Sequence, residues 1–327
     1  MKLSEAIGEL LVATEADGRS PRTVADYEQK LALLVDFMGD RGLEEIVVGD
    51  LRRFVAYLRG REGRYVGHPN RDQIEGGLSI ASVAGYVRAV KRLFNFLYEE
   101  EIIEANPARK LRTPKPGRGE PKAITADDFV RLLDATEGDS LVNRRDRALV
   151  LFLADTGCRV GGVVNLKTSE VDITKQVARV TEKGNHTRVV PFSRTTGRAL
   201  AAWLEVRPAV AYDHVFINLG NRGGAALTTN GVRQVLRRLK RRSGAKGPVN
   251  PHSFRHGFAR EYLLNGGDLA SLADLLGHRD VKTTWASYAI FRMDELCVKH
   301  GRHSPVAVMG RRGDLVEDSG PSPGYCR

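Results

Sequence analysis

Cysteine is scarce in this sequence of 327 residues, and its spacing excludes two common uses of the residue. The three cysteines, Cys158, Cys297 and Cys326, are an odd number and do not stand at metal-ligand separations. They therefore predict neither a disulfide framework nor a zinc site, and they indicate a reducing compartment.

Long apolar runs are also missing, and we expect no secretory leader. No run of about 18 apolar residues occurs, so we expect no membrane span. Acidic residues interrupt the first twenty positions, which is not typical of a signal peptide: Glu5, Glu9, Glu15 and Asp17. These absences make the cytoplasm the expected location. No Gly-x-x-x-x-Gly-Lys-Ser/Thr loop for nucleotide phosphates is present either.

Positive charge is what the sequence has in excess. It holds 51 Lys+Arg against 40 Asp+Glu, for a formal net charge of +11. This balance favours an anionic partner, most commonly nucleic acid, although a solvated basic surface accounts for the same excess. The length suggests two domains, and a hydrophobic content of 42% is enough for a core in each.

The first part of the chain is predicted to be a small helical domain. Ser20-Pro21 is a typical helix start, and Asp50 and Ser79 are expected to cap two further helices. Residues 60–77 are polar and glycine-rich, which predicts a loop. Apolar residues at helical spacing predict core packing, and they leave basic faces between them, such as Arg88, Lys91 and Arg92.

A linker is expected after Asn106-Pro107, because residues 113–121 contain three prolines and two glycines. We divide the chain into a first domain at residues 1–110, a linker at 111–121 and a second domain at 122–300. The remaining tail, residues 301–327, is predicted to be loose.

The second domain is predicted to be mostly helical with one small antiparallel sheet. Thr125 to Asp128 is a capping-box variant, and residues 147–156, which are nearly all apolar, predict a buried helix that ends just before Arg159. Residues 171–192 alternate with period two around Gly184-Asn185, which predicts a hairpin. Further helices are expected around residues 199–203, 230–242, 254–264, 269–276 and 283–289. The fold class is therefore mainly α, with an α+β second domain.

Six polar residues of this second domain form a candidate active site: Arg159, Lys183, His252, Arg255, His278 and Tyr288. No carboxylate cluster that could hold a metal accompanies them, and we expect no cofactor. Guanidinium groups donate paired hydrogen bonds to the charge that builds up on a phosphodiester. A lysine can protonate a leaving oxygen, and a tyrosine can supply the nucleophile. The set therefore predicts metal-free breakage and rejoining of DNA.

The settings of these residues fit the same chemistry. Lys183 stands beside the tip of the predicted hairpin, from which a lysine can reach a leaving 5′-oxygen. His252 and Arg255 are three residues apart and share a helix face. His278 follows Gly277, a natural helix stop.

In this order the residues resemble the tyrosine recombinases of the phage-integrase superfamily. In that family an arginine follows a Thr-Gly-x motif, as Arg159 does, and a lysine sits on a hairpin, as Lys183 does. The His-x-x-Arg box matches residues 252–255, the Leu-Gly-His box matches residues 276–278, and Tyr288 matches the nucleophile. The resemblance covers roughly residues 1 to 300 and implies a helical core-binding (SAM-like) domain followed by a catalytic domain.

The resemblance implies a site-specific DNA recombinase. Tyr288 would attack the scissile phosphate, form a 3′-phosphotyrosyl bond and free a 5′-hydroxyl. Covalent storage of the bond energy accounts for the missing nucleotide loop. Two double-stranded DNA sites would be held by a tetrameric synapse of four protomers, with accessory proteins unknown. A mobile-element integrase or transposase is the preferred type.

Two features depart from the family pattern. Many relatives carry an acidic residue three positions after the first arginine, where this chain has Gly162, so the local support of Arg159 is left open. Many relatives also place the nucleophile nine residues after the histidine. Here Ser287 stands at nine and Tyr288 at ten. Tyr262 is a weaker candidate, because it falls within an amphipathic helix.

Two other functions stay open from the sequence. One is a DNA-binding protein with a catalytically impaired recombinase fold, for which Gly162 is the support. The other is an enzyme like a type IB topoisomerase, which uses similar chemistry as a monomer; the short chain and the core-binding domain argue against it.

Overall fold

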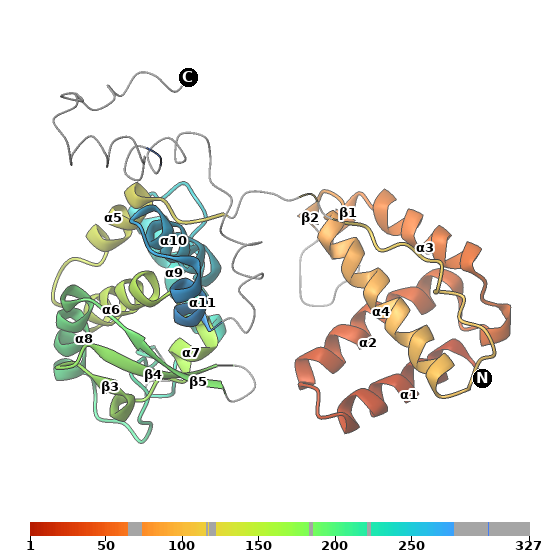
Figure 1. The fold of residues 1–327 in the computed structure, drawn as a ribbon, viewed down its shortest axis with the longest axis horizontal. Coiled ribbons are helices and arrows are strands. Elements are labelled where there is room, and N and C mark those ends of the chain that lie inside the picture. Colours follow the sequence, from red (N-terminus) through yellow and green to blue (C-terminus); the bar gives the residue numbers. More distant parts are fainter. Residues whose placement is uncertain are drawn as a thin grey trace, which may run out of the picture. The chain divides into compact units, whose positions relative to one another are not determined.

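The computed structural model describes residues 1–64, 74–115, 117, 122–182, 186–220, 224–277 and 300. The chain divides into two compact units, Met1–Gly119 and Glu120–Arg327 (Figure 1). Both are mostly helical, and the second contains a three-stranded antiparallel sheet, which confirms the predicted fold class. Among the helices in these ranges, none combines the length and apolar character that crossing a membrane requires.

The first unit is built from helices that pack around one core of leucine, valine and phenylalanine side chains. Its described helices are α1 (Leu3–Ala16), α2 (Pro21–Met38), the short 3-10 helix η1 (Leu43–Glu45), α3 (Val48–Gly60) and α4 (Ile80–Glu99). The Ser20 hydroxyl accepts the Thr23 N–H at the start of α2, and the Ser79 hydroxyl accepts the Ser82 N–H at the start of α4. Both predicted serine caps are therefore confirmed.

Two predictions for the first unit were wrong. Asp50 does not cap α3 from outside: it lies in the first turn, where its carboxylate accepts the Val47 N–H at 3.0 Å. An acid in that position satisfies the free N–H of the helix start from within the helix. The predicted loop at 60–77 also contains two short paired strands, β1 (Gly63–Arg64) and β2 (Ile74–Glu75). Strands of two residues are too short to show a period in the sequence.

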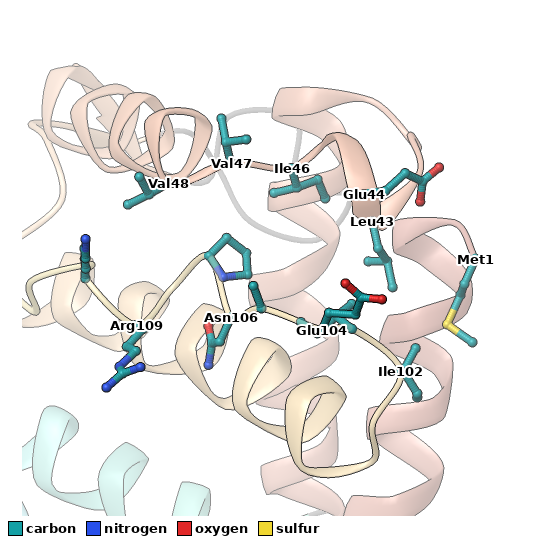
Figure 2. A pocket seen from close by; sticks show the side chains of 14 residues that line it. Met1, Leu43, Glu44, Ile46, Val47, Val48, Ile102, Glu104, Asn106 and Arg109 are labelled. Atoms are coloured by element: carbon teal, nitrogen blue, oxygen red, sulfur yellow. The ribbon is translucent and has the colours of Figure 1, made fainter.

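An apolar hollow of about 600 Å³ lies on the first unit (Figure 2). Side chains at the start of α3 line one side of it, and residues that follow α4 line the other. Val47 and Ile102, both partly exposed, are among its apolar residues. Of the candidate catalytic residues that the structure describes, Arg159, His252 and Arg255, none lines this hollow.

The second unit places helices around the small sheet. Its described helices are α5 (Ala126–Asp134), α6 (Leu141–Thr156), α7 (Val160–Val164), the 3-10 helix η2 (Thr168–Glu170), α8 (Arg194–Val206), α9 (Thr229–Ser243), α10 (Pro251–Leu264) and α11 (Leu269–Leu276). The strands β3 (Val171–Asp172), β4 (Val177–Glu182) and β5 (His186–Pro191) pair in this order. Glu182 pairs with His186 at the end of the predicted hairpin. The helix predicted at residues 283–289 lies outside the described residues.

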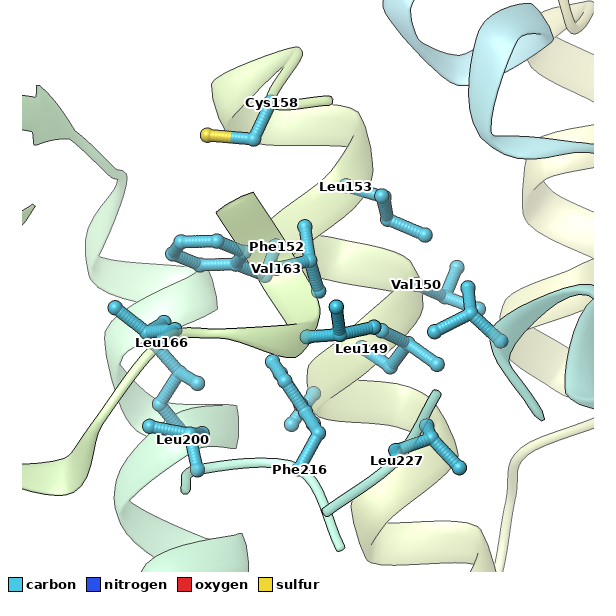
Figure 3. Close-up of a cluster of buried hydrophobic side chains, with 14 of the residues drawn as sticks. Leu149, Val150, Phe152, Leu153, Cys158, Val163, Leu166, Leu200, Phe216 and Leu227 are labelled. Atoms are coloured by element: carbon cyan, nitrogen blue, oxygen red, sulfur yellow. The ribbon is translucent and has the colours of Figure 1, made fainter. Parts of the chain in front are cut away.

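Helix α6 is the buried centre of this unit and it positions Arg159. Leu149, Phe152 and Leu153 are fully buried, and α6 packs against both α8 and α10 (Figure 3). The helix ends at Gly157, whose φ of 57° lies in the left-handed region. A Cβ atom at Gly157 would stand 2.6 Å from the Phe258 ring, so only glycine fits this turn. The chain therefore leaves the core at a fixed point, two residues before Arg159.

The predicted capping box at the start of α5 is half right. The Thr125 hydroxyl accepts the Asp128 N–H at 3.1 Å, as a cap does. The Asp128 carboxylate does not return to Thr125. It accepts the N–H groups of Lys246 and Gly247, at 3.0 and 2.8 Å, in the turn between α9 and α10. This carboxylate satisfies backbone groups far away in the sequence, which local spacing cannot predict.

Candidate active site

Arg159 lies at the junction of α6 and α7, where it is the N-cap residue of α7. Its backbone is held by the buried end of α6, whereas its side chain is 42% exposed. A fixed backbone with an open guanidinium is the arrangement that an anion-binding arginine requires.

A buried carboxylate supports Arg159. Glu182, the last residue of β4, has a side chain that is only 5% exposed, and it accepts the main-chain N–H of Arg159 at 3.1 Å. It also forms an ion pair with the Arg159 guanidinium and accepts a hydrogen bond from Arg188 at 3.0 Å. Burial raises the pKa of Glu182, but the charge of Arg188 and the Arg159 main-chain N–H outweigh burial. The pKa of Glu182 therefore lies below its ordinary value of 4.5.

The sequence analysis missed Glu182 and Arg188 as members of this site. A signal was nevertheless present, because the period of two that predicted the hairpin puts position 182 on one face with Ala178 and Val180. Both of those residues are buried, at 1% and 0% exposure. A carboxylate on the core-facing side of a strand needs a charged or hydrogen-bonding partner, and it therefore marks a buried ion pair.

Arg188 connects the sheet to the last turn of α11. Its guanidinium donates to the main-chain carbonyl of Leu275 and to Glu182, and it also contacts the Cys158 sulfur at 3.7 Å. Burial raises the pKa of the Cys158 thiol, which keeps that thiol neutral.

Arg255 joins the ends of two helices. Its side chain lies on α10 and is 4% exposed. Its two terminal nitrogens donate to the carbonyl of Gly157 at 2.9 Å and to the carbonyl of Leu276 at 2.7 Å. The chain is thereby fixed two residues before Arg159 and two residues before His278.

The C-terminal end of α11 receives two guanidinium groups, from Arg188 and Arg255, on consecutive carbonyls. Positive charge is favourable at a helix C-terminus, where carbonyls lack partners within the helix. Gly277 then ends α11 with a φ of 65°, as predicted for a helix stop. A Cβ atom there would stand 2.9 Å from Arg188 Nε, so a side chain at position 277 would disturb this arrangement.

His252 lies exposed in the first turn of α10, one turn before Arg255. Asn250 caps this helix by accepting the His252 N–H at 3.0 Å. The neighbouring His256 is half-buried, and burial, together with the charges of His252 and Arg255, lowers its pKa. Tyr262 packs against Phe258, with ring centroids 5.9 Å apart.

Arg255 links α10, which also carries His252, to the segment that carries Arg159. Lys183, His278, Tyr288 and Ser287 lie outside the described residues. The residues that precede two of them are described. Glu182, before Lys183, contacts Arg159. Gly277, before His278, follows Leu276, whose carbonyl accepts a hydrogen bond from Arg255. Within the described part of the chain, no group of His, Cys, Asp and Glu residues could hold a metal ion.

We predict that Arg159→Lys and Arg255→Lys have different effects on folding. An ammonium group cannot reach the carbonyls of both Gly157 and Leu276, and an unsatisfied buried acceptor costs about 1–3 kcal/mol. Arg255→Lys should therefore lower the free energy of unfolding by that amount. The more exposed Arg159→Lys should change it little. Urea denaturation of both variants measures the difference, and equal stability would contradict the bridging role of Arg255.

Three comparisons describe what the chain is similar to. Residues 122–294 match the phage integrase family. The tyrosine recombinase XerD of Listeria monocytogenes serotype 4b (strain F2365) is 31% identical over 277 residues, which cover 82% of this chain and 87% of that protein. The tyrosine recombinase XerC of Chromobacterium violaceum is 30% identical over 315 residues, or 95% of this chain and 99% of that protein.

The fold also has a counterpart among solved structures. The Tn1549 transposon integrase, in complex with transposon right end DNA, has a TM-score of 0.72. The match covers 92% of this chain and 99% of that chain, at 15% sequence identity. At this identity the likeness concerns the fold alone.

Proposed function

The chain belongs to the phage integrase family and is a tyrosine recombinase, an enzyme that breaks and rejoins DNA strands, and we propose that Tyr288 is its nucleophile. The observation that carries the proposal is the linked set of contacts from Arg159 through Glu182 and Arg188 to α11, with Arg255 closing the set. These contacts hold Glu182 and Arg188 on the two sides of Lys183, and Leu275 and Leu276 before His278.

In the proposed reaction the Tyr288 oxygen attacks the scissile phosphorus as the bond to the 5′-oxygen breaks. The phosphoryl group stays on the 3′ side as a phosphotyrosine, Lys183 gives its proton to the 5′-oxygen, and the tyrosyl proton passes to a basic group of the site. Arg159 and Arg255 supply positive charge to the non-bridging oxygens. Attack by a 5′-hydroxyl of the partner strand reverses these steps and joins the exchanged strands.

The contact between Glu182 and Arg159 argues against an impaired enzyme. Gly162 was the support for that alternative, because it stands where many relatives carry an acid. A carboxylate nevertheless reaches Arg159, from a different element of the fold. Recombination between two short DNA sites would separate the proposed reaction from that of a topoisomerase.

Tyr288→Phe is expected to abolish covalent adduct formation and to preserve DNA binding, since it removes only the hydroxyl nucleophile. The measurement is a denaturing gel of the protein incubated with a nicked suicide substrate, beside a native gel shift. Ser287→Ala is the matched control and should form the adduct at the wild-type rate. An undiminished adduct in the Tyr288 variant, with loss in the Ser287 variant, would assign the nucleophile to Ser287.

An arginine row on α9 is our candidate for a DNA-binding face of the second unit. The helix buries Val232, Val235, Leu236 and Leu239 on one side. Arg233, Arg237 and Arg241 are exposed at intervals of four residues, which places them on one face about 6 Å apart along the axis. The described residues provide none of the three with a hydrogen bond or ion pair. Unpaired guanidinium groups in a row are suited to successive phosphates.

Changing Arg233, Arg237 and Arg241 together to Gln should weaken DNA binding and reduce its salt dependence. Each lost phosphate contact lowers the slope of log K against log salt by about 0.9. Gel shifts over a range of salt concentrations measure the slope. The control changes Arg194 and Arg198, which are exposed on α8. An unchanged slope in the α9 variant, or an equal change in the control, would place the DNA elsewhere.

Self-association on DNA is the second part of the proposal. An apolar groove of about 520 Å³ lies on the second unit, lined by Phe129 of α5 and by Phe258 and Tyr262 of α10, among others. The segment after Tyr288, which lies outside the described residues, carries Ile290, Met293 and Cys297 at near-helical spacing. We propose that this segment of one protomer docks in the groove of the next protomer in a tetrameric synapse, as the family resemblance implies.

Truncation after Ala289 should then leave binding to a half-site intact while it reduces cooperative binding to the full site. The reason is that the truncated chain loses the proposed docking segment but keeps the described helices and strands of both units. Gel shifts on half-site and full-site DNA compare the two. Unchanged cooperativity, or loss of folding on truncation, would instead indicate that the segment packs on its own protomer.

A further inference from the structure

We propose that Glu182 is the positioning residue of Arg159, and that it supplies from strand β4 the carboxylate that helix α7 lacks. The inference rests on the proposed catalytic role of Arg159. Glu182 is thereby added to the site as a residue that orients Arg159 and does not itself contact the DNA.

The position of Gly162 in α7 shows what is missing. Arg159 is the N-cap of α7, so Gly162 occupies the third helical position. In a capping box, the side chain at that position accepts the main-chain N–H of the N-cap residue. Glycine has no side chain to do so. In this protein Glu182 Oε1 accepts the Arg159 N–H at 3.1 Å, while Oε2 pairs with the Arg159 guanidinium.

The space beside α7 admits only one such carboxylate. A Cβ atom on Gly162 would stand 3.3 Å from Glu182 Cγ, 3.5 Å from Val180 Cβ and 3.7 Å from Glu182 Oε1. A longer side chain at position 162 would therefore occupy the place of the Glu182 side chain. The neighbouring Gly161 differs, because a Cβ atom there would meet nothing within 4 Å. Gly162 and Glu182 thus form a complementary pair.

The charges around Glu182 explain why removing its carboxylate would change the orientation of the Arg159 side chain. One carboxylate is shared by Arg159 and by Arg188, whose side chain is 15% exposed. Without that carboxylate, the two guanidinium groups would face each other without neutralisation. Arg188 stays held by the Leu275 carbonyl, whereas Arg159 has an exposed side chain that would turn away from it. The orientation of Arg159 is therefore the property that depends on Glu182.

The test is a set of full-length variants assayed for single-turnover cleavage of suicide DNA, DNA affinity and melting temperature. Glu182→Gln and Glu182→Ala should lower the cleavage rate by about 10²-fold, the size expected for a misplaced catalytic group, with DNA affinity retained. Glu205→Gln, an exposed glutamate of α8, should cleave at the wild-type rate. Gly162→Glu alone should also lower the rate, because a second carboxylate crowds and repels Glu182.

The decisive variant combines Gly162→Glu with Glu182→Ala. It should recover most of the rate lost in Glu182→Ala, since the new carboxylate stands in the third position of α7 and enters the vacated space. Gly161→Glu in the same Glu182→Ala background adds an identical charge one residue earlier and should recover nothing. A rescue limited to position 162 is not expected of a residue that merely stabilises the fold.

The inference would be overturned by wild-type cleavage by Glu182→Gln, by no recovery in the Gly162→Glu and Glu182→Ala combination, or by equal recovery with Gly161→Glu. A rate loss matched by an equal loss of folded protein in both Glu182 variants would also overturn it, because that result assigns Glu182 a structural role only. Failure of the proposed function is distinguishable, since wild-type protein would then form no adduct, or Tyr288→Phe would form it unchanged.

Discussion

The arrangement of the helices in the second unit depends on one buried guanidinium. Arg255 is almost completely enclosed, and a charge in that setting persists only with hydrogen-bond partners. The carbonyls of Gly157 and Leu276 provide them, and both are the free carbonyls of helix ends. The same contact that satisfies Arg255 therefore fixes where α6 and α11 end relative to α10. Arg159 follows the end of α6, and Gly277, the residue before His278, follows the end of α11.

A second set of contacts, centred on Glu182, determines the charge between α7, the sheet and the end of α11. One carboxylate, Glu182, serves two guanidinium groups, from Arg159 and Arg188, and a backbone N–H. Arg188 then adds its charge to the end of α11, next to the charge of Arg255. Arg159 and Arg188 thus share a single carboxylate, while Arg255 donates to main-chain carbonyls, and the three arginines together leave an excess of positive charge. An excess of this kind suits a phosphodiester that gains negative charge during attack.

The sequence predicted the elements whose causes are local. The serine caps at Ser20 and Ser79, the pairing of β4 with β5 and the stop of α11 at Gly277 depend on neighbours close in the sequence. Predictions were wrong or incomplete where a carboxylate acts over a distance. Asp128 binds a turn more than 110 residues away, and Glu182 binds an arginine 23 residues before it. The alternation along β4 marks Glu182 as core-facing, but local spacing identifies the partner in neither contact.

The sequence by itself determined the reaction class, because the residue types and their order restrict the chemistry to a phosphodiester and a hydroxyl nucleophile. It also placed Arg159 after a buried helix and Arg255 one turn after His252. Only the tertiary structure decided how Arg159 is supported. From the sequence, Gly162 indicates that the usual acidic residue beside Arg159 is absent. In the structure the carboxylate of Glu182, on β4, contacts Arg159, because the sheet packs against α7. A carboxylate supports the arginine wherever it comes within contact distance, and the fold of the chain, rather than sequence separation, determines that distance.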